Sequence, residues 1–297
     1  MTDLQEVSDW WRTSIIEMHP GVIRLRNHPI EALIGNVGFP AMIWLMVAGR
    51  LPNKAEARLL ESALVAAVDH GPQAPSIAAA RMAVTCGLPL NSALATAVNM
   101  LGDVHGGAGE QALRLYFDIA ERADAAEDLE RAAEIGVREW QSMHGRFVPG
   151  FGHRFHKNGD PRSPRLLSLV DEAASTGAVS GKFARIGRAI EGVLSGGGRL
   201  IPMNIDGATA VIFAELGCEP PLARGLFCLS RSVGILAHAW EQMKQGGRNK
   251  GPVPPGFLFT YDPPNAELGK SPARSTSREI LREPDDLPIK KHDTEED

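Results

Sequence analysis

The segment from Val148 to Arg162 concentrates residue types that bind anions and transfer protons. It reads Val-Pro-Gly-Phe-Gly-His-Arg-Phe-His-Lys-Asn-Gly-Asp-Pro-Arg and lies between two segments with helical spacing. Its glycines allow the backbone to approach a ligand closely, while His153 and Lys157 offer a proton and a point charge, and Arg162 offers a forked anion clamp. A solvated turn between two helices is the alternative interpretation, because clusters of glycine and proline usually mark loops.

Three histidines lie next to glycine, where the helical spacing breaks. They are His70 in Asp-His-Gly-Pro, His105 in Val-His-Gly-Gly-Ala and His153 in Phe-Gly-His-Arg. Each one alone fits a surface or helix-terminal histidine that makes one backbone hydrogen bond. Because loop ends converge on a cleft more readily than residues along a helix, the three together favour a shared site.

Two charged residues lie against apolar sequence. Asp206 precedes Gly-Ala-Thr-Ala-Val-Ile, so it is either the N-cap of a helix or a general base, and the two roles are compatible. Arg231 lies inside the apolar run 226–236. Because a buried guanidinium without an anion is costly, we expect it to meet a carboxylate, which belongs either to the protein or to a ligand.

The composition is that of an ordinary globular protein and limits its partners. The chain has 297 residues, 43% hydrophobic and 23% charged, and a net charge of -5 that argues against a general nucleic-acid or anionic-membrane binder. Cys86, Cys218 and Cys228 form no CxxC pair or metal-ligand spacing, so we expect reduced thiols and no metal site. The start lacks a signal-peptide pattern and no window suits a membrane span, which predicts a cytoplasmic protein without a membrane partner.

The apolar spacing from residue 30 to about 250 is helical and predicts an all-α fold. The clearest stripe runs from Ala55 to Val68. Further helices are expected over 75–86, 90–101, 110–120, 125–143, 164–175, 181–194, 207–216 and 222–245. From about 263 to 297 the sequence turns polar and predicts a disordered or wrapping tail. Trp10 and Trp11 give the first segment an apolar face that must pack on its own domain or on a partner subunit.

Taken in order, these motifs resemble those of the citrate synthase superfamily. The segment 148–162 resembles that family's most specific motif, and His105-Gly-Gly-Ala resembles the motif of its first catalytic histidine. The Asn-Ile-Asp that ends at Asp206 resembles the segment that carries its aspartate base, and the run that contains Arg231 resembles its late arginine helix. The stretch 69–76, Asp-His-Gly-Pro-Gln-Ala-Pro-Ser, looks more like the citryl-CoA lyase branch than like ordinary synthases.

The resemblance implies an all-α homodimer in which a smaller inserted helical domain closes over the substrates. The large helical domain would comprise 1–147 and 246–262, the small domain 148–245, and the tail 263–297. The implied chemistry joins or cleaves a carbon–carbon bond between an acyl-CoA and a 2-keto acid such as oxaloacetate. Coenzyme A would enter as the thioester substrate, with no permanently bound cofactor.

The resemblance also implies a role for each candidate residue. Asp206 would remove the α-proton of acetyl-CoA while His105 hydrogen-bonds the thioester oxygen, because a lone carboxylate is too weak a base unless another group stabilises the enolate. His153 would polarise the ketone and protonate the new alkoxide. The other assignments are His70 and Arg162 for the keto acid's oxygens, Arg231 for a carboxylate, and Val148, Pro149, Gly150, Phe151, Gly152 and Lys157 for coenzyme A.

The direction of the reaction divides the alternatives. The lyase-like stretch favours citryl-CoA lyase, in which His153 would deprotonate the tertiary hydroxyl and Asp206 would return a proton to the acetyl-CoA enolate. The alternatives are a citrate or 2-methylcitrate synthase-like enzyme, on oxaloacetate or another keto acid, and a non-catalytic CoA-binding protein.

One departure from the family pattern bears on the keto acid. The Arg-Pro that follows the last long helix in the family sends an arginine into the partner's active site. Here that dipeptide is Gly251-Pro252, with Arg248 nearby but displaced. If no residue replaces that arginine, a second substrate carboxylate loses its forked partner, and oxaloacetate becomes a poorer fit.

Overall fold

The computed structural model describes residues 4–196, 200–254, 256–257 and 259–261. The chain forms two compact units, Met1–Pro252 and Val253–Asp297, and the helices and strands of the described residues lie in the first unit. The tail predicted over 263–297 lies outside the described residues.

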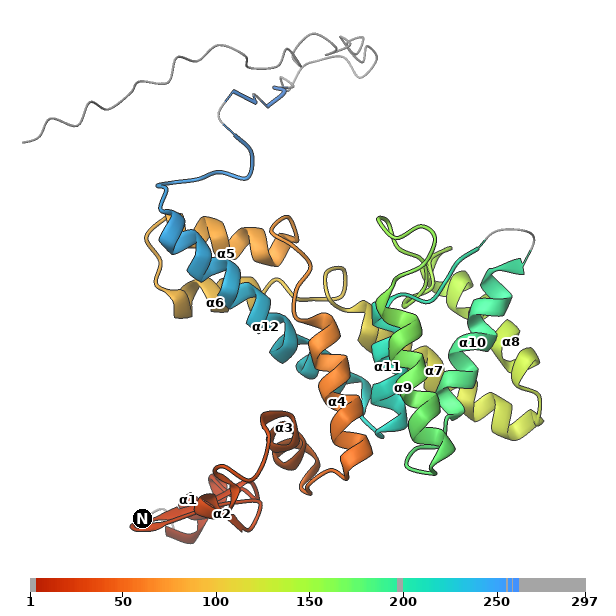
Figure 1. The fold of residues 1–297 in the computed structure, drawn as a ribbon, viewed down its shortest axis with the longest axis horizontal. Helices are drawn as coiled ribbons and strands as arrows, with labels where there is room; N and C mark the ends of the chain where they lie inside the picture. Colours follow the sequence, from red (N-terminus) through yellow and green to blue (C-terminus); the bar gives the residue numbers. More distant parts are fainter. Residues whose placement is uncertain (1–3, 197–199, 255, 258, 262–297) are drawn as a thin grey trace, which may run out of the picture. The chain divides into compact units, whose positions relative to one another are not determined.

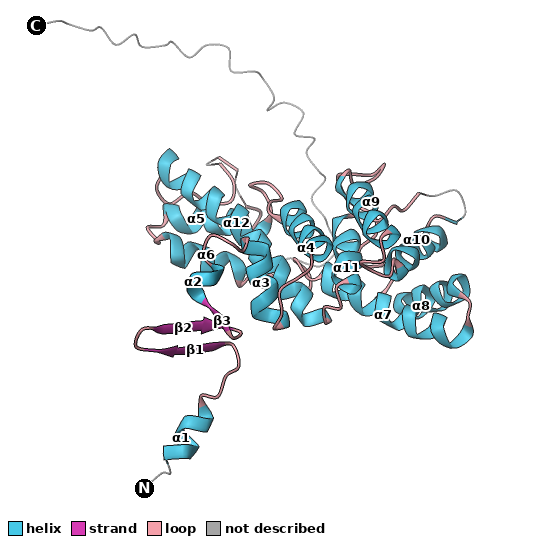
Figure 2. Ribbon diagram, turned by 60° about the horizontal axis from the view of Figure 1, so that its bottom comes forward, coloured by secondary structure: helices cyan, strands magenta, loops and turns pink. Residues whose placement is uncertain are grey.

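The N-terminal part combines a short helix with a small antiparallel sheet. Helix α1 (Leu4–Trp10) precedes strands β1 (Ile16–His19), β2 (Val22–Leu25) and β3 (His28–Pro29), which pair in the order β1-β2-β3 (Figure 2). The Arg26 guanidinium donates to the Met46 carbonyl at 2.8 and 3.2 Å, which ties the sheet to the helices that follow. Trp10 and Trp11 are 82% and 79% exposed, so their predicted packing on their own domain is wrong, and packing on a partner subunit is the alternative left.

The rest of the first unit is helical, as the apolar spacing predicts. The helices are α2 (Ile30–Leu33), α3 (Phe39–Ala48), α4 (Lys54–Ala67), α5 (Pro75–Thr85), α6 (Leu90–Val98), α7 (Ala108–Ala126), α8 (Leu129–His144), α9 (Arg162–Ser175), α10 (Lys182–Leu194), α11 (Ile205–Glu215) and α12 (Pro220–Gln245). The all-α fold class is confirmed, with the small sheet as an addition. None of the described helices is long and apolar enough to cross a lipid bilayer.

The main core surrounds α11, which is apolar on nearly every side. Its Ala208, Ala210 and Ile212 are fully buried, and α4, α7, α9 and α10 pack around them (Figure 1). A second, smaller core lies between α5, α6 and α12. Helix α12 contacts α5 and α6 in that core and also reaches α4 and α7, so it connects the two cores.

The boundary predicted at residue 148 lies between helices of the main core. Helices α7 and α8 precede it and α9, α10 and α11 follow it, yet all five contribute to the same hydrophobic cluster. A small domain that closes over the substrates implies a movement between an open and a closed state. The predicted division into a large and a small domain therefore stays a prediction.

Candidate active site

The loop from 145 to 161 is held tightly against the segment that leads into α11. The Asn204 amide donates to the Gly150 carbonyl at 2.9 Å, its side-chain amide donates to Gly152 O at 2.6 Å, and the Gly152 amide donates to Pro202 O at 2.7 Å. Val148 and Phe151 are only 6% and 9% exposed. The solvated-turn interpretation is therefore wrong for residues 148–152, whereas residues 154–158 are exposed.

Two glycines allow this close approach. Gly150 has φ +84°, and a Cβ placed on it would lie 2.7 Å from the Gly207 Cα. A Cβ on Gly207 would in turn meet the Gly150 carbonyl oxygen and would lie 2.7 Å from Met203 Cγ. Because two backbones touch without side chains between them, the loop that carries His153 lies directly beside the first turn of α11.

The main chain sets the proton position on His153. Its Nδ1 faces the amides of Phe155 and His156, each at 3.1 Å. An amide can only donate, so Nδ1 accepts and the neutral ring carries its proton on Nε2. Burial, followed by the charge of His156, lowers the pKa of His153. His153 therefore offers a hydrogen-bond donor at Nε2, and its ring lies edge-on to that of His70, with 5.7 Å between centroids.

The opposite tautomer is set at His105. The Ser76 amide donates to its Nε2 at 3.3 Å, and the Ser76 hydroxyl lies 2.9 Å from the same atom. The neutral ring therefore carries its proton on Nδ1. Burial, followed by the charge of Arg231, lowers the pKa of His105. Ser76 is fully buried and was not among the predicted site residues, because its position at the end of the stretch Gly-Pro-Gln-Ala-Pro-Ser does not reveal this contact.

Asp206 is the second residue of α11, and the prediction that it is the N-cap is wrong. Asn204 is the N-cap, and its side-chain oxygen accepts from the amides of Asp206 at 2.9 Å and Gly207 at 3.3 Å. Within the described part of the chain, no hydrogen bond or ion pair is recorded for the half-buried Asp206 carboxylate. Burial raises the pKa of Asp206, and the charges of Arg231 and Arg162 oppose that rise. A carboxylate with a raised pKa and free oxygens has the properties of a general base.

Arg231 is buried and lacks a protein anion. It is 6% exposed, its Nε donates to the Ala67 carbonyl at 3.0 Å, and its guanidinium lies 4.9 Å from the centroid of the Phe227 ring. No carboxylate of the described residues forms an ion pair with Arg231. Of the two expected partners, a protein carboxylate is therefore excluded for these residues, and an anionic ligand is favoured. Its charge lowers the pKa of His70 and His105 as well as that of Asp206, so these groups share one electrostatic environment.

Arg162 is already paired within the protein. Its Nε and Nη2 donate to the two carboxylate oxygens of Asp160 at 2.9 and 2.8 Å, and its Nη1 donates to Ala66 O at 3.3 Å. The Asp160 side chain is fully buried and also accepts from the Ile205 amide at 3.1 Å. Burial alone would raise the pKa of Asp160, but Arg162 outweighs it and lowers the pKa to about 2. A guanidinium has five N–H groups, so two stay available for a ligand.

A cavity of about 920 Å³ opens beside His153. Of the residues predicted to contact coenzyme A, Val148, Phe151, Gly152 and Lys157 line it, whereas Pro149 and Gly150 do not. Arg146 and Arg154 add two more cations to its wall. Sequence reasoning missed Arg154, whose charge also lowers the pKa of His70, His105 and His153.

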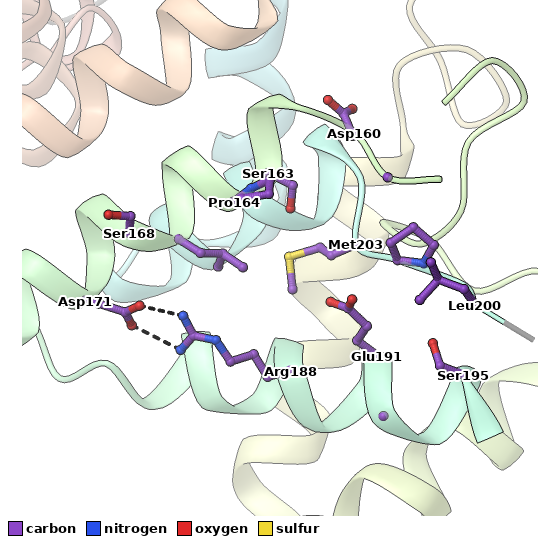
Figure 3. Close-up of a pocket in the computed structure, with 14 residues that line it drawn as sticks. Asp160, Ser163, Pro164, Ser168, Asp171, Arg188, Glu191, Ser195, Leu200 and Met203 are labelled. Carbon is purple, nitrogen blue, oxygen red and sulfur yellow. Dashed lines mark hydrogen bonds and ion pairs between the residues drawn. The ribbon is translucent and has the colours of Figure 1, made fainter. Parts of the chain in front are cut away.

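A second cavity, of about 660 Å³, lies between α9 and α10 (Figure 3). The ion pair between Arg188 and Asp171, at 2.6 Å, spans it, and Glu191 extends from α10 toward Met203 (Figure 3). None of the predicted catalytic residues lines this cavity. In the described parts of the molecule, no group of three or more His, Cys, Asp or Glu side chains is arranged to hold a metal ion.

Comparisons with known proteins follow the same motifs. Residues 53–251 match the family described as citrate synthase, C-terminal domain. The chain is 26% identical over 224 residues to a citrate synthase of Acidithiobacillus ferridurans, covering 74% of this chain and 55% of that protein. It is 32% identical over 199 residues to a citrate synthase of Haloferax volcanii, covering 66% and 49%. The chain thus spans about half the length of these curated relatives.

A solved structure is similar over most of both chains. The structure of citryl-CoA lyase from Hydrogenobacter thermophilus is 30% identical, with a TM-score of 0.74, and the alignment covers 86% of this chain and 96% of that one. The citrate synthase of Pyrobaculum aerophilum is 26% identical with a TM-score of 0.61, over 77% and 56%.

Proposed function

Because the chain belongs to the citrate synthase family, we propose that its cleft makes or breaks a carbon–carbon bond between a CoA thioester and a 2-keto acid. The observation that carries this proposal is the hydrogen bonding of His105, His153 and Asp206. The main chain directs the proton of His105 to Nδ1 and that of His153 to Nε2, while the Asp206 carboxylate has no recorded protein partner. The site thus holds two neutral donors and one free base.

Enolisation of the thioester uses the first donor and the base. Asp206 takes the α-proton, and the Nδ1–H of His105 donates to the thioester oxygen as negative charge develops there. Burial raises the pKa of Asp206, which makes it a stronger base than an exposed aspartate. Burial also keeps His105 neutral, so that it acts as a hydrogen-bond donor without a net charge.

The keto acid uses the second donor and the arginines. The Nε2–H of His153 polarises the ketone, whose carbon is attacked by the enolate, while Arg231 and the two available N–H groups of Arg162 bind carboxylate oxygens. Coenzyme A occupies the 920 Å³ cavity, where Arg146, Arg154 and Lys157 face its phosphates. His70 lies against His153 and contacts the same substrate.

We favour citryl-CoA lyase as the direction, with oxaloacetate and acetyl-CoA as products. The support is the similarity to the Hydrogenobacter thermophilus lyase over 96% of that chain. In cleavage His153 takes the hydroxyl proton and the carbon–carbon bond breaks. The electron pair of that bond forms the thioester enolate, whose oxygen accepts from His105. Protonated Asp206 then gives its proton to the enolate carbon.

The tautomer of His153 makes a demand on this direction. Its Nε2 is already protonated, so it can take the hydroxyl proton only if the ring proton moves to Nδ1. That move breaks the hydrogen bonds from the amides of Phe155 and His156. A lyase therefore needs the turn over 153–156 to open. By microscopic reversibility, a synthase whose His153 protonates the alkoxide from Nε2 makes the same demand, because the ring would otherwise be left as an imidazolate. The curated relatives described as citrate synthases support a synthase of citrate or a related acid as the second candidate.

We also propose a homodimer in a reducing compartment such as the cytoplasm. The free state of Cys86, Cys218 and Cys228 fits such a compartment. One face of α12 exposes apolar side chains at alternating spacings of four and three, the pattern by which two helices pack side by side. They are Leu229, Val233, Leu236, Trp240 and Met243. Arg248, which follows that helix, is exposed, and we propose that it reaches the partner's site.

Product analysis tests the reaction. The protein is incubated with citryl-CoA while acetyl-CoA and oxaloacetate are followed together, and separately with acyl-CoAs and 2-keto acids while free thiol is followed. Asp206→Asn should abolish turnover in whichever direction the unaltered protein catalyses. It should leave CoA binding, measured by calorimetry, intact. Glu191→Gln in the second cavity is the control and should keep full activity. A fully active Asp206→Asn variant refutes the assignment, and CoA binding without turnover by the unaltered protein supports the non-catalytic alternative.

A further inference from the structure

We propose that His238 positions the loop that carries His70, through a hydrogen bond from its Nε2–H to Asp69. This role rests on the proposed function, because His70 matters only if it meets a keto acid. The His238 Nε2 lies 3.1 Å from Asp69 Oδ1, and Asp69 directly precedes His70 in the chain. The sequence motifs assign no role to His238.

The opposite side of the His238 ring fixes its proton. Arg81 Nη1 lies 3.4 Å from His238 Nδ1, and a guanidinium can only donate. Nδ1 is therefore an acceptor, and the ring proton lies on Nε2, where it points to Asp69. The ring thus accepts a hydrogen bond from a guanidinium on one side and donates one to a carboxylate on the other.

Arg81 is held in place by α12 itself. Its Nε donates to Gln242 Oε1 at 3.2 Å, its Nη1 to Glu241 Oε2 at 2.9 Å, and its Nη2 to Gln245 Oε1 at 3.0 Å. Because Glu241 accepts one of the two Nη1 hydrogens, the other Nη1 hydrogen is left for His238. The Arg81 side chain is only 17% exposed, so solvent does not compete freely for it.

The loop after α4 is held against α12 at the same level. The Gly234 amide donates to Val68 O at 3.1 Å, and a Cβ on Gly234 would meet that oxygen and would lie 2.9 Å from Asp69 Oδ1. The second oxygen of Asp69 accepts from the Gly71 amide at 3.1 Å. Asp69 therefore holds the main chain on the far side of His70 at Gly71, and His238 orients the Asp69 side chain.

Asp69 needs this orientation because it is largely exposed. Its side chain is 42% exposed, against 18% for His238. An exposed aspartate has several rotamers of similar energy. The bond from His238 selects the rotamer that also accepts from Gly71, and that rotamer fixes the path of the backbone through His70 to its contact with His153.

Two substitutions at one position separate this role from a simple packing role. His238→Gln keeps both hydrogen bonds, because the amide nitrogen can donate to Asp69 and the amide oxygen can accept from Arg81. His238→Leu keeps the volume and loses both. Glu241→Gln is the control, because it removes the charge of the exposed partner of Arg81 while its amide oxygen can still accept from Arg81 Nη1.

The kinetic expectation is specific to the keto-acid side. His238→Leu should raise the KM for the keto acid roughly tenfold or more, the loss that follows from one hydrogen bond to a charged group. The KM for the CoA thioester should not change, because the cavity beside His153 does not involve α12. His238→Gln and Glu241→Gln should both behave as the unaltered protein.

A second measurement does not depend on turnover. Nitrogen-15 NMR of the ligand-free protein with labelled histidine, assigned by the loss of one signal pair in His238→Gln, should report Nε2 protonated and Nδ1 unprotonated. A proton on Nδ1, a His238→Gln variant as impaired as His238→Leu, or a His238→Leu variant with an unchanged keto-acid KM would each overturn the proposal. Absence of turnover in the unaltered protein refutes the proposed function itself, a result that these three outcomes do not resemble.

Discussion

The contact between Gly150 and Gly207 yields the sharpest prediction about stability and activity together. Gly207 lies in the first turn of α11, where alanine is ordinarily the better residue by about 1 kcal/mol. Here its Cβ would meet the Gly150 carbonyl oxygen and would lie 2.7 Å from Met203 Cγ. Gly150 O cannot withdraw easily, because it accepts from the Asn204 amide at 2.9 Å.

Gly207→Ala should therefore destabilise the protein. Overpacking a buried contact costs about 1–3 kcal/mol, which offsets the gain in helix propensity and leaves a net loss of up to about 2 kcal/mol. Gly192→Ala in α10 is the matched control, because its Cβ would meet no atom within 4 Å. That variant should gain about 0.4–1 kcal/mol. Urea unfolding measures both, and the two substitutions should change the free energy of unfolding in opposite directions.

Activity should follow the same contact. Any shift that relieves the overpacking moves Asp206, which directly precedes Gly207, away from the loop that carries His153. A displacement of about 1 Å in a reacting group lowers turnover by about a hundredfold. Steady-state assays should find that loss in Gly207→Ala and full turnover in Gly192→Ala. A Gly207→Ala protein that is both stabilised and fully active would show that the two backbones are not in contact as described.

Two further predictions concern the pH profile and the assembly. In the synthesis direction kcat/KM should rise with pH along an acid limb whose midpoint exceeds the ordinary aspartate value of 3.8, because burial raises the pKa of Asp206 and the reaction needs its ionised form. Arg231→Gln should move this midpoint to still higher pH, since the guanidinium charge opposes the rise; an unchanged midpoint assigns the limb to another group. Leu236→Glu, in the exposed apolar face of α12, should yield a folded monomer by light scattering where the unaltered chain is a dimer, and a dimeric variant would assign the interface elsewhere.

The sequence predicted the all-α fold and most of its helices, whereas the roles assigned to the site residues stay predictions. The apolar periodicity and the glycine breaks predicted where α4, α9 and α12 lie in the chain. The same periodicity predicted that their apolar side chains are buried. His105 and His153 could be found because each sits in a glycine-containing motif with a recognisable order. The position of Asp206 was predicted, but its capping role was not, because Asn204 competes for the same helix start two residues earlier and both residue types cap well.

What the sequence could not reveal is the set of partners that each functional group already has. Arg162 was expected to be free for the substrate, yet Asp160, two residues away, occupies its fork. Ser76 and His105 are distant in sequence and meet only because α5 begins beside the loop before α7. Contacts of this kind depend on the relative placement of helices, which residue spacing does not encode.

The hydrogen bonds from the amides of Phe155 and His156 to His153 have a consequence for how such a protein diversifies. The proton on the imidazole is fixed by backbone groups, and every residue type except proline supplies them. The side chain of Phe155 can therefore vary without changing which nitrogen of the ring carries the proton, whereas His156 also acts on the ring, because its charge lowers the pKa of His153. Phe155 is 67% exposed, so substitutions of its side chain leave the hydrogen bond from its amide to His153 in place.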